Sequence, residues 1–361
     1  MNFENTEFRQ EVLDLTNPFD VKLVSGFLKT LGFEFNVAEV DFTLILYTLK
    51  GDIIGTGSHR GRILKYVAVS PKYRDSTAFA LVVTALVEKV LSVFRNVYVF
   101  TRPSNAVYFK GLGFKEIAVA KPLYCALEFG YETITNYQDY LKSVKKSSKT
   151  DKVAAIVVNC NPFTMGHRYL IEKAASENEL VYLFVVEEDH SVFPFVVRWE
   201  LIRKGISHLT NVVMVKGGDY IVSGSIFPAY FLKNELVSDI MKKQAELDVS
   251  IFANYVVPVL GIKKRYVGTE NYCKTTAAYN VAMHKILPAT GVEVIEIERI
   301  VSSGDASGSQ KCISASLVRE AIKNDTLEGM LSCLPEPTRE FLLSEESKLI
   351  REKIKNSNDR H

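Results

Sequence analysis

The second half of the chain alternates short apolar runs with longer segments whose apolar residues recur at helical spacing. Residues 153–159 form an unbroken apolar run, which is typical of a strand buried on both faces of a parallel sheet. Further predicted strands share this character and cover residues 180–186, 211–216, 265–268 and 292–298. Predicted helices separate or follow them, at residues 166–176, 194–208, 230–244, 275–287 and 316–324. This alternation predicts a Rossmann-like, doubly wound parallel sheet, in which ligands bind beyond the carboxyl ends of the strands.

The first half of the chain is richer in strands. Residues 43–50 and 52–58 are predicted strands on either side of a Lys50-Gly-Asp52 turn. The remaining predicted elements are strands at residues 63–69, 96–101, 114–120 and 123–129 and helices at residues 77–91 and 105–112. Helices inserted between strands in this way predict a smaller domain of the α/β or α+β class.

A polar, basic and serine-rich segment separates the two halves. Residues 142–152 follow a tyrosine-rich stretch and precede an abrupt apolar run, and their composition is typical of a linker. The predicted organisation is a first domain at residues 1–141, this linker, a second domain at residues 153–345 and a polar C-terminal tail at residues 346–361. A chain of 361 residues has the length of about two domains.

Composition narrows the class of protein. The net charge of +2 is too small for a dedicated nucleic-acid binder. The five cysteines are scattered without a Cys-x-x-Cys pair, so neither a zinc site nor a disulfide framework is expected and a reducing cytoplasm fits best. The most apolar predicted helix, residues 79–94, is interrupted by Glu88 and Lys89 and is too short to span a bilayer. The sequence therefore predicts a soluble, cytoplasmic protein without a membrane segment.

The first chemical motif connects a predicted strand to a predicted helix and reads Asn161-Pro-Phe-Thr-Met-Gly-His-Arg168. Pro162 ends the strand because it has no N–H to donate to the sheet. Gly166 permits a close backbone approach, and the helix directs its first N–H groups toward an anion bound there. His167, in the first turn, can donate a hydrogen bond to a phosphate. A strand–turn–helix with a structural histidine is the alternative interpretation of the same turn.

The full string resembles the T/H-x-G-H motif of the nucleotidyltransferase superfamily. The resemblance implies attack on the α-phosphate of a nucleoside triphosphate and release of pyrophosphate, with Asn161, Pro162, Phe163 and Gly166 in the ATP site. Thr164 stands at the first position, as in the pantetheine-phosphate adenylyltransferase branch. A threonine hydroxyl can bond a phosphate oxygen but carries no positive charge, so His167 is the principal imidazole of the predicted site.

A second motif lies at the start of a late predicted helix, where Ile313-Ser-Ala-Ser-Leu-Val-Arg319 resembles the superfamily signature I-S-x-S/T-x-x-R. Ser314 or Ser316 can cap this helix and present a hydroxyl to phosphates. Arg319, one turn further, has a planar fork that suits the β- and γ-phosphates. A third segment, Tyr266-Val-Gly-Thr-Glu270, places Gly268 and Glu270 where adenine and ribose are expected. Glu270 is predicted to accept from ribose hydroxyls, with a surface carboxylate as the alternative.

Several longer strings resemble the citrate lyase ligase family, and the resemblance covers both halves of the chain. They are residues 161–170, Phe193-Pro-Phe-x-x-Arg198, residues 217–233, residues 267–273 and Thr276-x-x-Tyr-Asn280. Membership of this family implies an enzyme that uses ATP and Mg²⁺ to activate acetate as acetyl-AMP. It also implies transfer of the acetyl group to the thiol of the phosphoribosyl-dephospho-coenzyme A group on the acyl carrier subunit of citrate lyase.

The resemblance implies roles for individual residues as well. His167 is expected at the α-phosphate, and Arg319 with Ser314 and Ser316 at the β- and γ-phosphates. Arg198, Lys216 and Lys233 are candidates for holding acetate or pyrophosphate, with solvated surface charges as the alternative. No protein ligand to a metal ion is assigned, because Mg²⁺ takes few protein ligands when it bridges phosphates.

The first half resembles the GNAT acetyltransferase pattern at residues 64–74 and 105–114. In that family a glycine-rich turn cradles the pyrophosphate of coenzyme A, but residues 74–79 contain no glycine here. The sequence therefore argues against acetyl-CoA chemistry in this half. We predict a docking role toward a coenzyme-A-like arm or a carrier protein, with Arg74 and Tyr108 as the candidate contacts, or else a structural role.

Two other functions remain open from the sequence. One is an adenylyltransferase acting on a phosphate acceptor such as pantetheine phosphate, which the extra N-terminal half and the long insert before Glu270 disfavour. The other is a catalytically silent module that binds nucleotide or carrier, which the intact His167 and Arg319 disfavour.

Overall fold

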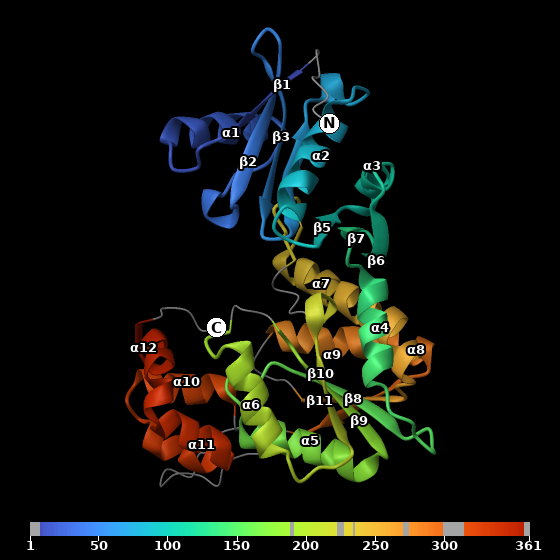
Figure 1. Ribbon diagram of the computed structural model, residues 1–361, viewed down its shortest axis with the longest axis vertical. Helices are drawn as coiled ribbons and strands as arrows, with labels where there is room; N and C mark the ends of the chain where they lie inside the picture. Colours follow the sequence, from blue (N-terminus) through green and yellow to red (C-terminus); the bar gives the residue numbers. More distant parts are fainter. Residues whose placement is uncertain are drawn as a thin grey trace. The chain divides into compact units, whose positions relative to one another are not determined.

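The computed structural model describes residues 8–187, 191–221, 227–233, 235–269, 274–298 and 314–356. It divides the chain into two compact units, shown in the colours of the sequence in Figure 1. The first unit is Met1–Asn136 with Ser225–Leu247, and the second is Tyr137–Gly224 with Asp248–His361. The second unit thus differs from the continuous domain predicted at residues 153–345, because Ser225–Leu247, from the middle of that range, packs with the first unit.

The first unit is built on a mixed sheet that has seven strands among the described residues. In spatial order these are β1 (Phe8–Val12), β2 (Phe42–Thr48), β3 (Ile53–Arg60), β4 (Ile63–Val69), β5 (Asn96–Thr101), β7 (Tyr124–Gly130) and β6 (Lys115–Ala120). Neighbouring strands are antiparallel, except that β4 and β5 run parallel. The six strands predicted from the pattern are present, and β1 is an addition.

Helices cover both faces of this sheet. They are α1 (Pro18–Thr30), α2 (Ala78–Leu91) and the short α3 (Ala106–Lys110). The apolar side of α2 packs on β3, where a Cβ added to Gly57 would lie 2.6 Å from Leu86, so glycine permits this close approach. On the other face Val24 and Leu28 of α1 join a separate core cluster with Tyr47. The sequence did not predict α1, although Asn17 accepts from the N–H of Phe19 as a helix cap.

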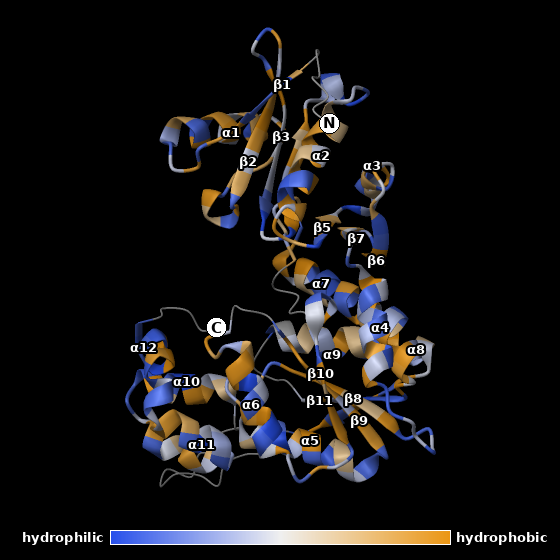
Figure 2. Ribbon diagram, in the orientation of Figure 1, coloured by the Kyte–Doolittle hydropathy of each residue, from blue (hydrophilic) through white to orange (hydrophobic). Residues whose placement is uncertain are grey.

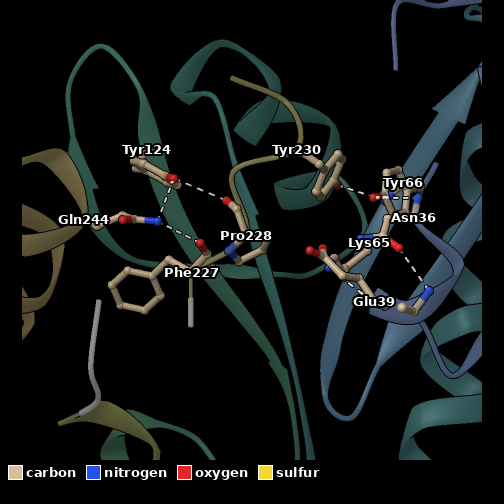
Figure 3. Close-up of polar contacts among 10 residues, drawn as sticks. Asn36, Glu39, Lys65, Tyr66, Tyr124, Phe227, Pro228, Tyr230 and Gln244 are labelled. Atoms are coloured by element: carbon tan, nitrogen blue, oxygen red, sulfur yellow. Dashed lines mark hydrogen bonds and ion pairs between the residues drawn. The ribbon is translucent and has the colours of Figure 1, made fainter. Parts of the chain in front are cut away.

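A segment from the second half of the chain belongs to the first unit. Phe227 and Leu232 are buried ahead of α7 (Val237–Ile251). Tyr230 is half-buried and packs its ring 4.3 Å from that of Tyr66 in β4 (Figure 3). The predicted helix at residues 230–244 is therefore displaced toward the C-terminus. Tyr230 and its neighbours serve as aromatic contacts of the first unit instead of forming a first helical turn.

The second unit contains a five-stranded sheet, again among the described residues, and all of its strands run parallel. The order is β10 (Val212–Lys216), β9 (Leu180–Val185), β8 (Val153–Val158), β11 (Lys264–Gly268) and β12 (Glu293–Ile297). Every residue of β9 is buried, and β8 and β9 are apolar along their length (Figure 2). This order confirms the predicted Rossmann-like, doubly wound sheet.

Both faces of this sheet are covered. The helices of the second unit, with α4 entering it from the first, are α4 (Ile134–Val144), α5 (Met165–Glu177), α6 (Phe195–Gly205), α8 (Val257–Leu260), α9 (Lys274–Ile286), α10 (Ala315–Lys323), α11 (Glu336–Leu343) and α12 (Lys348–Asn356). Ile171 of α5 and Ile202 of α6 share a core with β8 and β9. On the opposite face Phe252 packs against Phe184 of β9. Figure 1 shows α5 and α9 on different sides of the sheet.

The described parts of the predicted linker and of the predicted C-terminal tail make hydrogen bonds and packing contacts in the second unit. Within the predicted linker, the main-chain N–H groups of Lys149 and Thr150 donate to the carboxylate of Glu179 at 2.7 and 2.8 Å. Within the predicted tail, α12 buries Ile354 in a cluster with Val318 of α10. The polar composition of these segments did not predict the contacts, because few apolar residues anchor either segment.

Candidate nucleotide site

The first motif follows the central strand of the parallel sheet. From β8 the chain builds β9 and β10 on one side, whereas β11 and β12 lie on the other, so the strand order reverses between β8 and β11. The described ladder between these two strands contains only Lys264 opposite Ala154 and Arg265 opposite Ala155. The pair therefore opens toward its carboxyl ends, which is where ligands bind in sheets of this type. The first motif begins at the end of β8, and Gly268 ends β11.

Thr164 and His167 form a reciprocal cap at the start of α5. The Thr164 hydroxyl lies 3.5 Å from the His167 main-chain nitrogen and accepts from it, and the Thr164 N–H donates to His167 Nδ1 at 3.1 Å. The two side chains also meet at 2.9 Å. Because a main-chain N–H can only donate, Nδ1 must accept, and a neutral ring then carries its proton on Nε2. The cap thus prepares His167 as a hydrogen-bond donor through Nε2.

This cap engages the hydroxyl of Thr164 with His167, and its predicted contact with a phosphate oxygen stays a prediction. The residue is only 1% exposed, and its hydroxyl is engaged by His167. Thr164 therefore fixes the ring of His167, while the N–H groups of the first turn and Nε2 are the donors suited to a phosphate. An anion at a helix N-terminus is stabilised by about 0.3–1 kcal/mol from the helix dipole, and by more when partly buried.

The second motif contacts the first, although the two are separated by about 150 residues of sequence. Arg319 of α10 donates through Nη1 to the main-chain carbonyl of Asn161 and through Nη2 to Ser316 Oγ at 3.4 Å. Ser314 caps α10, since its Oγ accepts from the N–H of Leu317 at 3.3 Å. Burial lowers the pKa of Arg319 from its ordinary value, yet a guanidinium remains charged. The structure thus brings a fixed positive charge to the loop between β8 and α5.

The other residues of the first motif shape that loop. The side-chain oxygen of Asn161 accepts from the N–H of Phe193 at 3.0 Å, and the peptide bond between Asn161 and Pro162 is cis. Phe163 is fully buried, and a Cβ added to Gly205 of α6 would lie 2.5 Å from its ring. Asn161 and Phe163 are therefore held by packing and main-chain contacts, which fix the position of the turn before His167.

Arg198 is the largest fully buried side chain of the described residues. Its Nε donates to the carbonyl of Phe193 at 2.9 Å, and its Nη1 donates to the carbonyls of Asn159 at 2.8 Å and Val186 at 2.7 Å. Arg198 thus ties the carboxyl ends of β8 and β9 together. This orientation does not fit the predicted contact with acetate or pyrophosphate and gives Arg198 a positioning role. In a sequence, a charged residue predicts either a surface position or a contact with a ligand. The sequence therefore gave no indication that Arg198 positions the ends of two strands.

The two lysines predicted for the same task lie in different units. Lys216 ends β10 with an exposed side chain, and its main chain is held by the hydroxyls of Tyr137 and Tyr140 at 3.0 and 3.1 Å. Lys233 belongs to the first unit, where its amine lies 3.7 Å from Glu34. Lys216 therefore stays a candidate at the carboxyl edge of the sheet, whereas the contacts of Lys233 are those of a surface ion pair.

The remaining predicted residues are placed only in part. The carbonyl of Gly268 accepts from Asn280 Nδ2 at 3.1 Å, which fixes the end of β11. Glu270 and Ile313 lie outside the described residues. In the first unit Arg74 is exposed, and Tyr108 is 55% exposed and packs on Phe79 with ring centroids 5.9 Å apart.

The donors at this site fit a polyphosphate better than a bare metal ion. The first turn of α5, His167 Nε2 and Arg319 all present positive or hydrogen-bond-donating groups. Among the described residues, no group of three or more His, Cys, Asp or Glu side chains is placed to hold a metal ion. A divalent cation at such a site is carried by the phosphates themselves. None of the described helices has the length and apolar character needed to cross a membrane.

The second unit has a doubly wound α/β fold, and the two motifs meet at the switch point of its parallel sheet. Solved structures similar to parts of the chain include a bifunctional NMN adenylyltransferase/ADP-ribose pyrophosphatase from Francisella tularensis, with a TM-score of 0.35, 14% identity and coverage of 57% of this chain and 52% of that one. A GNAT-family acetyltransferase from Staphylococcus aureus has a TM-score of 0.29 and 10% identity, and covers 34% of this chain and 100% of that one.

Relatives identified by sequence define the family of this chain more specifically than the solved structures do. Residues 153–342 match the family described as the citrate lyase ligase C-terminal domain. A [citrate [pro-3S]-lyase] ligase of Klebsiella pneumoniae is 35% identical over 296 residues, which is 81% of this chain and 84% of the relative. The protein of the same name from Haemophilus influenzae is 33% identical over 350 residues, covering 95% of this chain and 98% of the relative. The chain therefore belongs to the citrate lyase ligase family and is an enzyme.

Proposed function

We propose that this enzyme activates acetate with ATP and then acetylates the thiol of the prosthetic group on the acyl carrier subunit of citrate lyase. The main support for this proposal is a contact between the two motifs. Arg319 of the late motif donates to the carbonyl of Asn161 in the first motif, so the charge for a triphosphate and the N-terminus of α5 lie at one loop. Both groups lie where ligands bind in a doubly wound sheet.

In the first step a carboxylate oxygen of acetate attacks the α-phosphorus of ATP. The new bond joins acetate oxygen to phosphorus, and the bond between the α-phosphorus and the bridging oxygen breaks, releasing pyrophosphate. His167 donates through Nε2 to a non-bridging oxygen of the α-phosphate, where negative charge accumulates. Arg319, with the nearby Ser316 hydroxyl, binds the leaving β- and γ-phosphates. Alignment matters because a carboxylate is a weak nucleophile that the triphosphate repels.

In the second step the thiol of the carrier-bound prosthetic group attacks the carbonyl carbon of acetyl-AMP. A thioester bond forms, the bond from carbonyl carbon to the AMP oxygen breaks, and AMP leaves with that oxygen. The thiol proton passes to solvent or to the departing phosphate. Mg²⁺ bound to ATP would neutralise part of the triphosphate charge, and the phosphates would supply most of its ligands.

The experiment that tests this function is isotopic exchange of labelled pyrophosphate into ATP. We expect exchange that depends on acetate and needs no carrier, because the first step is reversible on the enzyme. Exchange with pantetheine phosphate and none with acetate would replace the proposal by an adenylyltransferase. Absence of exchange with any acceptor would leave a silent nucleotide- or carrier-binding module.

We further propose a cytoplasmic location. The three described cysteines, Cys125, Cys160 and Cys333, are free and buried, which suits a reducing compartment. Measurement of the activity in the soluble fraction of gently lysed cells, kept under reducing conditions, checks this proposal.

A further inference from the structure

The first unit contains an opening between its two parallel strands. The ladder between β4 and β5 consists of Ile63 opposite Tyr98 and Leu64 opposite Val99, as far as the described residues show. Beyond these pairs β4 runs on to Val69 and β5 to Thr101. Tyr66, two residues past the ladder, has a φ of 51°, and the register of β4 against β3 shifts at this point. Such a bulge redirects a main-chain group out of the sheet.

The segment that starts at Phe227 contacts both sides of this opening. On the β4 side, the main-chain N–H of Tyr66 donates to the hydroxyl of Tyr230 at 2.9 Å, and the two rings lie 4.3 Å apart. On the β5 side, the ring of Phe227 lies 4.8 Å from that of Phe100. Figure 3 shows Tyr230 directed at Tyr66, with Phe227 and Pro228 beside Tyr124.

Further polar contacts hold the backbone of the segment. The hydroxyl of Tyr124 donates to the carbonyl of Pro228 at 3.3 Å, and the Gln244 amide donates to the carbonyl of Phe227 at 2.8 Å and to Tyr124 at 3.1 Å (Figure 3). At its far end Glu235 forms an ion pair with Arg102, just after β5, at 3.0 Å. The segment is therefore held by ring contacts, by hydrogen bonds to its main-chain carbonyls and by an ion pair. Peptide ligands are held by the same kinds of contact.

We propose that residues 227–233 and Glu235 are a built-in ligand of the first unit, which closes the opening between β4 and β5 to any acyl-thioester or coenzyme-A-like arm. The redirected N–H of Tyr66 and the ring of Phe100 could offer an extended, amide-bearing ligand a hydrogen-bond donor and an apolar wall. Tyr230 accepts from that N–H and Phe227 packs on that ring instead. The first unit then holds a segment that comes from the second half of the sequence. This inference does not depend on the proposed ligase reaction.

Hydrogen exchange of the full-length protein, followed by mass spectrometry, tests the proposal. Tyr230→Phe removes only the hydroxyl that accepts from Tyr66. We expect the amide of Tyr66 to exchange about fivefold faster or more, the effect of losing one buried hydrogen bond. The matched control is Tyr131→Phe, an exposed tyrosine of the same unit, which should leave β4 as in the wild type. Tyr230→Ala should accelerate exchange across both β4 and β5.

A titration with free coenzyme A and with acetyl-CoA supplies the second readout. At millimolar ligand we expect no binding heat and no change in the exchange of residues 63–69 or 96–101 of the wild type. Two results would overturn the proposal: protection of these strands by coenzyme A in the wild type, or unchanged exchange at Tyr66 in Tyr230→Phe. Because Tyr230→Phe keeps the aromatic ring, either result can be read even if Tyr230→Ala does not fold.

Discussion

Each unit has one pair of parallel strands joined by only two described residue pairs, β4 with β5 in the first and β8 with β11 in the second. Both pairs open toward their carboxyl ends. In the first unit the opening contains aromatic side chains of the protein itself, Phe227 and Tyr230. In the second unit it is bordered by hydrogen-bond donors and by the charge of Arg319.

The difference lies in what the chain places at the opening. In the first opening the rings of Phe227 and Tyr230 exclude water, and the hydroxyl of Tyr230 accepts from the N–H of Tyr66 in β4. These contacts stabilise the first unit. A helix N-terminus and a guanidinium attract a charged ligand, so the second opening is suited to binding. The same interruption of a sheet can therefore hold a structural segment or a nucleotide. Side chains rather than backbone decide between the two.

The largest expected effect is a loss of stability when the ring of Tyr230 is removed from the opening between β4 and β5. Tyr230→Ala removes a half-buried aromatic ring and leaves the N–H of Tyr66 without its acceptor. We expect the free energy of unfolding to fall by about 3 kcal/mol, the lower end for aromatic-to-alanine changes. Urea denaturation of the full chain measures it. Pyrophosphate exchange per folded molecule should stay within about twofold, since Tyr230 belongs to the first unit and shares no described partner with the residues of the nucleotide site in the second. A loss below 1 kcal/mol would mean that the segment is not held as described.

His167→Ala tests the second opening. Removing a donor at the α-phosphate should slow acetate-dependent pyrophosphate exchange about 100-fold, or about 2.7 kcal/mol in the barrier. The matched control is His208→Ala, an exposed histidine of the same unit that contacts Glu172, which should keep the wild-type rate. Circular dichroism of both variants should match the wild type. A near-normal rate in His167→Ala would remove His167 from its assigned role.

Arg198→Met tests whether this buried arginine positions the loop before His167. The carbonyls of Asn159, Val186 and Phe193 would lose their donor. We expect about 2 kcal/mol less stability and a roughly tenfold slower exchange rate, because small displacements of catalytic groups are costly. The KM for acetate should change little if Arg198 does not touch acetate. Arg203→Met, on the exposed side of the same helix, is the control. A large rise in KM for acetate with an unchanged kcat would restore Arg198 as a substrate ligand.

The smallest expected effect concerns residues 145–152. Hydrogen bonds from the N–H groups of Lys149 and Thr150 and from the Thr150 hydroxyl lower the pKa of Glu179 to about 2. Because the pKa is depressed in the folded state, this anchoring is present above the ordinary pKa of 4.5 and is lost as the pH falls toward 2. At neutral pH, Glu179→Gln should make trypsin cleave this segment a few times faster, with Glu200→Gln as control. Equal cleavage would show that Glu179 does not anchor it.

The sequence predicted best where one physical signal decides the structure. Continuous apolar runs gave β8 and β9 nearly residue for residue, and the strand–turn–helix at Pro162 and Gly166 placed the first motif at the switch point. Ser314 as the cap of α10 also followed from local chemistry. Such features depend on neighbours in the chain, so they can be read from it.

The rest depended on contacts between distant residues. Apolar spacing indicated a helix from Tyr230, but it could not show that Tyr230 has its partner in β4, 164 residues earlier. Arg198 looked like a ligand for anions because charge normally implies exposure, and only the fold reveals three carbonyls around it. Similarly, the contact of Arg319 with Asn161 spans 158 residues. The two motifs could be named from the sequence, but this contact could not.

One isotope measurement tests the central claim that acetate attacks the α-phosphate at the loop where the two motifs meet. The enzyme is turned over with ATP, the citrate lyase carrier bearing its thiol, and acetate labelled with ¹⁸O in both oxygens. Attack on the α-phosphorus followed by thiolysis transfers one acetate oxygen to AMP. We therefore expect one ¹⁸O per AMP formed and unlabelled pyrophosphate. Label in inorganic phosphate, or AMP without label, would contradict the account.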